Sequence, residues 1–188
     1  MSLFDLTGVV SEIKSSSALC GNSRIVTIDG PAGSGKTTLA NEIAIELAKS
    51  QVDVTVVHLD ELYEGWENAL EPKLYERIDA WILAPLRNGL GPRHLKFDWH
   101  LNRYAAWSEL PAASIVIIEG VGSGHTSLRE EVSQAIWVEA DEHLLLDRVV
   151  ERDGFTVRDE MLIWKVRERD YFELHGVKQA AQIHLRGQ

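Results

Sequence analysis

Short apolar runs alternate with longer segments of helical periodicity along most of the chain. Five strand-length runs are rich in β-branched residues: residues 25–28, 52–57, 115–118, 136–138 and, more weakly, 183–185. Runs without polar alternation are typical of parallel strands that are buried on both faces. Strands separated by helices imply right-handed crossover connections. The pattern therefore predicts an α/β fold, three-layered and doubly wound, with a central parallel sheet of about five strands.

The first twenty residues carry a different pattern. Four apolar residues recur there at helical spacing: Leu3, Leu6, Val10 and Ile13. This spacing predicts a short amphipathic helix, which either covers the rest of the protein or forms a homodimer surface. No repeat, low-complexity tract or linker divides the chain. We therefore expect a single domain over residues 1–188, with an N-terminal helical extension over residues 1–20.

The composition is that of an ordinary globular protein, with 45% hydrophobic and 26% charged residues. The formal net charge is −10, from 19 Lys and Arg against 29 Asp and Glu, which argues against a nucleic acid or an anionic membrane as the partner. The N-terminus resembles no signal peptide, and no apolar stretch approaches a membrane span of about 20 residues. A single cysteine, Cys20, allows no internal disulfide. We expect a soluble, cytoplasmic protein.

A glycine-rich loop directly follows the first predicted strand. It matches G-x-x-x-x-G-K-[ST], the Walker A pattern, in every fixed position, and a helical apolar stripe comes after it. Glycines let successive amides turn toward phosphate oxygens, and the helix adds the positive end of its dipole. Lys36 is expected to reach the β- and γ-phosphates, and the Thr37 hydroxyl to hold Mg²⁺. The predicted ATP-binding residues are Gly30, Pro31, Ala32, Gly33, Ser34, Gly35, Lys36, Thr37 and Thr38.

Two carboxylates, Asp60 and Glu61, follow the second predicted strand. If the first two strands are neighbours, Asp60 lies beside the phosphate loop, where it can accept the proton of an attacking hydroxyl or bind Mg²⁺ through water. Glu61 can perform the same role, and Asp60 is also a favoured helix N-cap. The chain lacks an Asn-Lys-x-Asp guanine motif and a Leu-Ser-Gly-Gly-Gln signature. These absences leave mainly small-molecule kinases and regulatory ATPases.

Further segments follow in a recognisable order. After the phosphate loop come Asp60-Glu61-Leu62-Tyr63, Phe97-Asp98-Trp99, Ile117-Ile118-Glu119-Gly120, and the arginines Arg148 and Arg152 before Asp153-Gly154. Over residues 24–187 the chain resembles the uridine kinase and phosphoribulokinase group of P-loop kinases. The resemblance implies a P-loop NTPase fold with a small helical lid, at about residues 148–160.

The same resemblance implies transfer of the γ-phosphate of ATP to a hydroxyl of a small molecule. The catalytic residues would be Asp60 as base, Lys36, and the lid arginines Arg148 and Arg152, with Arg158 as a further candidate in the lid. Mg²⁺ would lie near Thr37, Asp60 and Glu119. ATP and Mg²⁺ are therefore the expected cofactors.

The acceptor is less well defined by the sequence. Candidate substrate residues are Tyr63, Trp66, Phe97, Asp98, Trp99 and Arg103. Phe97 stands where the group usually has tyrosine, and residues 64–79 lack its His-Pro-x-Ala-Phe-Asp segment, so a nucleoside is the expected acceptor class without a named member. Trp66 and Trp99 can stack on a planar ring. The other four tryptophans are expected in the core: Trp81, Trp107, Trp137 and Trp164.

Two alternatives stay open. Residues 28–33, Ile-Asp-Gly-Pro-Ala-Gly, are similar to the first loop of nucleoside monophosphate kinases of the cytidylate type. Such an enzyme would need additional cations for the acceptor phosphate. Alternatively, the protein is a non-catalytic ATP-binding regulator that signals through lid closure, and Asp60 then has no catalytic role.

Overall fold

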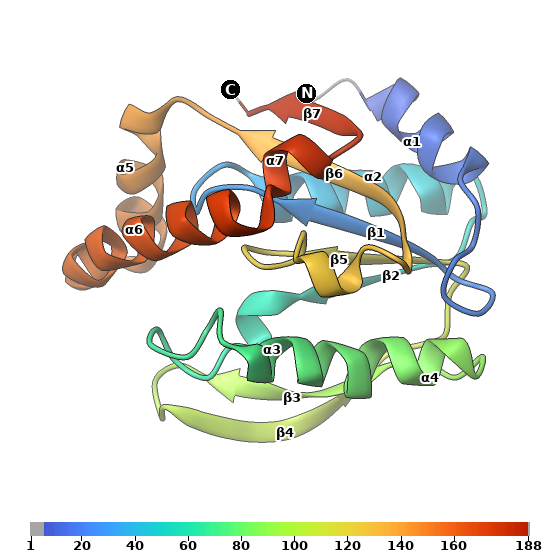
Figure 1. Ribbon diagram of the computed structural model, residues 1–188, viewed down its shortest axis with the longest axis horizontal. Helices are drawn as coiled ribbons and strands as arrows, with labels where there is room; N and C mark the ends of the chain where they lie inside the picture. Colours follow the sequence, from blue (N-terminus) through green and yellow to red (C-terminus); the bar gives the residue numbers. More distant parts are fainter. Residues whose placement is uncertain (1–5, 188) are drawn as a thin grey trace.

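Five parallel strands form the centre of the protein in a computed structural model, which describes residues 6–187 (Figure 1). In chain order they are β1 (Arg24–Asp29), β2 (Val54–His58), β5 (Ile115–Glu119), β6 (Val132–Glu139) and β7 (Ile183–Arg186). They lie in the order β2-β5-β1-β6-β7, and every neighbouring pair is parallel. Each predicted run forms one of these strands. The doubly wound α/β fold of the P-loop NTPases, with a central five-stranded sheet, is therefore confirmed.

The second strand begins at Val54, two residues later than the apolar run predicts. Gln51 has a positive φ of 58°, and the amide of Val52 donates a hydrogen bond to the carbonyl of Leu47 in the preceding helix. The prediction was wrong at these two positions because the backbone is still turning away from the helix there. An apolar side chain alone does not show where a turn ends.

Two helices cover one face of the sheet: α1 (Leu6–Ser15) and α2 (Lys36–Lys49). The predicted apolar stripe of α2 is fully buried: Leu39, Ile43 and Leu47. Helix α1 buries three side chains in the same cluster: Leu6, Val9 and Ile13. The N-terminal helix is therefore confirmed over residues 6–15, and its apolar face packs within the chain. Leu3, also in the predicted stripe, lies outside the described residues.

Helical segments cover the opposite face, and a β-hairpin lies alongside them (Figure 1). The helical segments are α3 (Pro72–Arg77), a π-helical segment (Ile78–Leu83), α4 (Ala84–Arg87), α6 (Arg158–His175) and α7 (Val177–Ala180). The hairpin pairs β3 (Arg93–Asp98) with β4 (Arg103–Glu109) in antiparallel orientation, apart from the main sheet. The sequence pattern did not predict this hairpin, although its strands and turn carry four of the candidate substrate residues.

The four tryptophans expected in the core differ in their burial. Trp137 and Trp164 are buried, as predicted, and Trp81 is half-buried. Trp107 is 49% exposed, so its assignment to the core was wrong. It lies on β4, whose pattern of exposed residues shows that no further layer covers its outer side, and its ring packs against Trp81 at 5.5 Å between centroids. An aromatic residue in a strand pattern is buried only if another layer covers that face.

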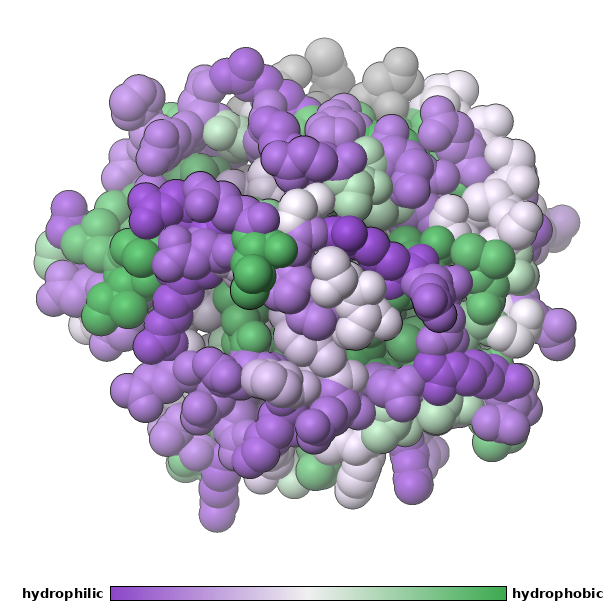
Figure 2. Space-filling model, in the orientation of Figure 1, coloured by the Kyte–Doolittle hydropathy of each residue, from purple (hydrophilic) through white to green (hydrophobic). Residues whose placement is uncertain are grey.

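A pair of helices projects beyond the sheet at the left of Figure 1. Helix α5 (Glu142–Asp153) packs on α6, and a 3₁₀ turn (Phe155–Val157) joins them, so the predicted lid spans this connection. Figure 2 shows apolar side chains gathered in the same region, where Phe155 is 75% and Ile163 61% exposed. Across residues 6–187, no helix combines the length and apolar composition needed to cross a membrane.

Candidate active site

The phosphate loop occupies the turn between β1 and α2. Gly30, Gly33 and Gly35 have positive φ values of 147°, 81° and 98°. A Cβ on Gly30 would lie 2.0 Å from the carbonyl oxygen of Val138, and one on Gly33 would lie 2.4 Å from that of Leu145. Glycine is required because backbone from β6 and α5 lies directly against the loop. No side chain caps α2, so the amides of its first turn are available to an anion.

Lys36 is held across this loop. Its Nζ donates hydrogen bonds to the carbonyl oxygens of Gly30 at 2.8 Å and Pro31 at 2.9 Å. Burial lowers the pKa of Lys36, and the carboxylates of Glu119, Glu168 and Asp29 oppose that shift. The ammonium group is thus fixed at the loop before any phosphate arrives. Together with the glycine backbone and the uncapped helix, it makes a cradle that fits a triphosphate.

Glu119 connects three strands at the carboxyl edge of the sheet. It ends β5 and lies between Ile28 of β1 and His58 of β2 in the strand register. Its Oε1 accepts a hydrogen bond from Thr37 Oγ1 at 2.9 Å and lies 2.6 Å from His58 Nδ1. The hydrogen bond to Glu119 raises the pKa of His58. The buried carboxylate thus reaches the hydroxyl predicted to hold Mg²⁺.

The donor set around Thr37 and Glu119 suits Mg²⁺. In the part of the chain that the structure describes, no three His, Cys, Asp or Glu side chains gather into a metal cage. Mg²⁺ prefers oxygen ligands and usually keeps several waters beside one or two carboxylates and substrate phosphates. One hydroxyl and one carboxylate at a phosphate loop fit that mode of binding.

Asp60 and Glu61 lie in the 3₁₀ turn Leu59–Glu61 that follows β2. Asp60 was expected beside the phosphate loop if the first two strands were neighbours, and this condition is not met because β5 lies between β1 and β2. Asp60 instead neighbours Glu119: desolvation by the surrounding protein raises the pKa of Asp60, and the negative charge of Glu119 raises it further. Among the described residues, the Asp60 carboxylate makes no hydrogen bond or ion pair.

Glu61 has a different environment. Its carboxylate accepts a hydrogen bond from Lys96 Nζ at 2.8 Å and lies 2.8 Å from His94 Nε2, both on β3. Burial raises the pKa of Glu61, but these two partners outweigh burial and hold it below its usual value. Glu61 therefore fastens the turn to the hairpin, which leaves Asp60 as the uncommitted carboxylate.

Aromatic rings line the space beyond Asp60. The ring centroid of Trp66 lies 5.1 Å from that of Trp99 and 5.7 Å from that of Trp164. The Trp99 indole donates a hydrogen bond to the backbone oxygen of Asp60 at 3.0 Å. A hollow of about 370 Å³ opens beside Trp66 and Trp164. Its charged lining consists of Glu64, Glu67, Glu160 and Arg167. The structure thus brings together the two tryptophans that the sequence selected for stacking.

The other candidate substrate residues have packing or turn contacts. Tyr63 is buried, and its hydroxyl donates to the carbonyl of Val121 at 2.5 Å. Phe97 is buried edge-on against Trp99. Asp98 accepts the amides of residues 100 and 101, both at 2.9 Å, and so closes the hairpin turn. Arg103 is exposed opposite Asp98 in the strand register.

The lid arginines differ in their contacts. Arg148 Nη1 donates to the carbonyl of Gly33 in the phosphate loop at 3.3 Å. Arg152 binds Asp153 through two hydrogen bonds of 2.7 and 2.6 Å, while Asp60 and Glu119 also act on its charge. Arg158 is exposed at the start of α6. The lid therefore already touches the phosphate loop through α5.

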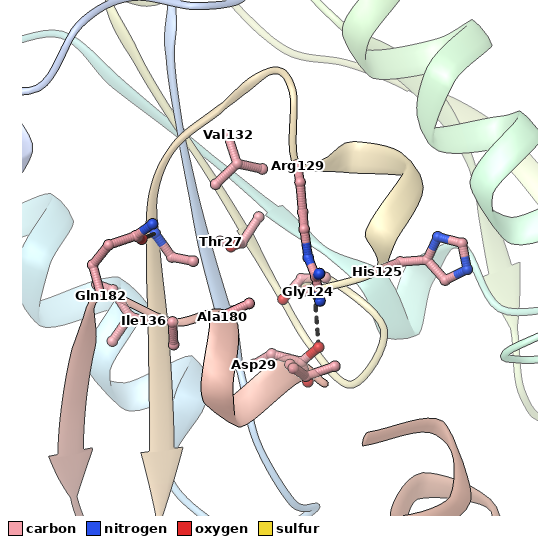
Figure 3. A pocket seen from close by; sticks show the side chains of 13 residues that line it. Thr27, Asp29, Gly124, His125, Arg129, Val132, Ile136, Ala180 and Gln182 are labelled. Carbon is pink, nitrogen blue, oxygen red and sulfur yellow. Dashed lines mark hydrogen bonds between the residues drawn. The ribbon is translucent and has the colours of Figure 1, made fainter. Parts of the chain in front are cut away.

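Sequence reasoning missed two buried carboxylates beside the loop, Asp29 and Glu168. Asp29 accepts the amides of Gly30 at 2.7 Å and Gly124 at 2.8 Å, and the Tyr171 hydroxyl at 3.1 Å, and burial raises its pKa to about 6. Figure 3 shows the bond to Gly124 among the residues that line a small pocket. An acid ending an apolar strand was an available signal for Asp29. Glu168, in a polar helical segment, had none.

Comparisons with known proteins agree with this fold. A family model described as an AAA domain matches residues 26–172. No curated protein matches the chain. Among solved structures, a possible uridine kinase from Bacillus stearothermophilus is similar at a TM-score of 0.69 and 17% identity, covering 96% of each chain.

A second similar structure is D-glycerate 3-kinase from Cryptococcus neoformans var. grubii. Its TM-score is 0.58 at 13% identity, over 96% of this chain and 91% of that one. At such identities the likeness concerns the fold, which is that of the P-loop kinases. Because the family model matches most of the sequence, this chain belongs to the AAA domain family.

Proposed function

We propose that the protein is an ATP-dependent phosphotransferase that moves the γ-phosphate of ATP to a hydroxyl of a small, uncharged compound, with a nucleoside as the leading class. The observation that carries this proposal is the environment of the Asp60 carboxylate. This carboxylate has no hydrogen-bond partner among the described residues, and it neighbours Glu119. The Asp60 backbone oxygen accepts a hydrogen bond from the Trp99 indole, whose ring packs on Trp66 at the edge of the hollow. A carboxylate without a partner, close to Glu119 and joined through its backbone to Trp99, is a candidate general base.

Each part of the site then has a role. Bound Mg·ATP supplies the transferable phosphoryl group. The loop amides and Lys36 bind and orient the phosphates, and Thr37 with Glu119 would hold the metal ion. Asp60 accepts the proton of the attacking hydroxyl, and its raised pKa makes it a stronger base than an ordinary aspartate.

The charges around the hollow favour an uncharged acceptor. The hollow is lined by the three carboxylates of Glu64, Glu67 and Glu160 and by one guanidinium, that of Arg167. Glu64 is paired with Arg77 at 2.5 Å, and Arg167 donates to the Trp66 carbonyl at 2.8 Å. A phosphate on the acceptor would therefore meet negative charge, which argues against a nucleoside monophosphate. Trp66 and Trp99 offer ring faces for a planar group.

The test compares Asp60→Asn with the matched neighbour Glu61→Gln. ADP release is measured with a library of hydroxyl compounds that includes uridine, cytidine, CMP and dCMP. We expect uridine or cytidine to exceed their monophosphates, and Asp60→Asn to lower turnover by about 10²-fold or more, without changing ATP affinity. We expect Glu61→Gln to retain turnover within a few fold.

Two outcomes would contradict the proposal. Full activity in Asp60→Asn would overturn the base assignment. Tight ATP binding without transfer to any compound would favour the alternative of a non-catalytic regulator.

A further inference from the structure

Glu168 of α6 contacts the phosphate loop from the side opposite to α2. It is only 4% exposed, and its Oε2 accepts a hydrogen bond from the amide of Ala32 at 2.9 Å. Ala32 is the third residue of the loop. One amide of the loop is therefore bonded to an anion that belongs to the protein itself.

Other charged groups face this carboxylate. Lys36 of α2 attracts it, Asp29 of β1 repels it, and the Trp164 indole, one turn earlier in α6, donates to it. A nucleotide at this loop adds several negative charges close to two buried carboxylates and one lysine. In a buried site such repulsion is costly unless a carboxylate takes up a proton.

Of the two carboxylates, Glu168 is the one that protonates more easily. Asp29 is held by three amides and a hydroxyl, all of which favour its charged form, whereas Glu168 has one amide and one indole. Burial raises the pKa of Glu168 to about 7 and that of Asp29 to about 6. Near neutral pH, Glu168 is therefore close to its midpoint.

We propose that Glu168 is a positioning residue of the phosphate loop that takes up a proton when nucleotide binds, so that α6 couples nucleotide affinity to pH. The inference rests on the proposed function only in requiring that the loop binds a nucleotide. Protonated Glu168 removes one negative charge from the loop and keeps an oxygen that can accept the Ala32 amide. α6 also carries Trp164 of the aromatic hollow, so the same helix contacts both sides of the site.

The test is titration calorimetry of Mg·ATP without an acceptor, at pH 7 in two buffers of different ionisation enthalpy. We expect the wild-type protein to take up about half a proton, and its affinity to fall roughly tenfold between pH 6 and pH 8. Glu168→Gln keeps an oxygen for the Ala32 amide but cannot titrate. It should lose the proton uptake and bind Mg·ATP more tightly than wild type at pH 8.

Two further variants serve as controls. Glu173→Gln changes an exposed acid on the same helix and should behave as wild type. Asp29→Asn should retain most of the uptake. Wild-type uptake in Glu168→Gln, or its loss only in Asp29→Asn, would overturn the inference but leave the proposed function intact. Absence of Mg·ATP binding in the wild-type protein would overturn both.

Discussion

At the scale of single residues, the glycines of positive φ differ in what surrounds them. Gly33 has backbone of α5 where its Cβ would be, whereas Gly89, with a φ of 70°, has nothing within 4 Å. We predict that Gly89→Ala costs about 1 kcal/mol from backbone strain alone. Gly33→Ala should cost more and abolish Mg·ATP binding, because the loop or α5 must move. Urea unfolding and calorimetry measure the two effects.

Equal destabilisation by these two alanines, with nucleotide binding preserved in Gly33→Ala, would contradict this account. The comparison is informative because both positions need a left-handed backbone, so the strain is shared and the difference isolates the contact with Leu145. Gly33 is thus required for packing of the lid as well as for the turn itself.

At the scale of elements, helix α5 approaches the site through its arginines. The side chain of Arg152 is 66% exposed, so its pair with Asp153 adds little stability. Its charge nevertheless lies in the field of Asp60 and Glu119, where transferred phosphate charge would develop. We predict that Arg152→Ala lowers turnover by about 10²-fold and changes the free energy of unfolding by less than about 0.5 kcal/mol. Steady-state kinetics and urea unfolding provide the measurements.

The matched change is Arg158→Ala, at an exposed arginine on the other arm of the lid. We expect its turnover to stay within about twofold of wild type, since nothing in the described residues ties it to Asp60 or Glu119. Similar losses in both variants would mean that net lid charge, and not the place of Arg152, sets the rate.

At the scale of the whole molecule, the buried carboxyls make folding depend on pH. Asp29 and Glu168 have pKa values raised to about 6 and about 7, whereas such groups ionise near pH 4 in an unfolded chain. The folded protein therefore binds more protons between these values, and its stability falls as pH rises. We predict that these two carboxyls contribute a loss of roughly 1–2 kcal/mol between pH 6 and pH 8 in nucleotide-free protein, measured by urea unfolding of the wild type and of variants at the two positions.

Glu168→Gln should remove most of that dependence. His58 also has a raised pKa and acts in the same direction, whereas His125 and His175 have lowered pKa values and act in the opposite direction. The difference between variant and wild type therefore isolates Glu168. A pH dependence in Glu168→Gln equal to that of the wild type would show that Glu168 is charged throughout this interval.

By itself, the sequence determined the elements whose physics is local. The phosphate loop was readable because its glycines, lysine and threonine act within eight consecutive residues, between a strand and a helix. The five strands of the main sheet could be predicted because short apolar runs rich in β-branched residues are typical of strands. The hairpin of β3 and β4 was not predicted because one of its faces is exposed and its apolar residues form no continuous run.

Only the tertiary structure decided which side chains share the site. Strand order is a property of layers that pack across the whole chain, so the place of β5 between β1 and β2 was not readable from the sequence. That order puts Glu119 against Thr37 and leaves Asp60 beyond it. The contact of Glu61 with the hairpin and the hydrogen bond of Glu168 to the phosphate loop likewise join segments that lie more than thirty residues apart in the sequence. Local patterns predict elements, whereas contacts between distant elements distinguish a free carboxylate from a bound one.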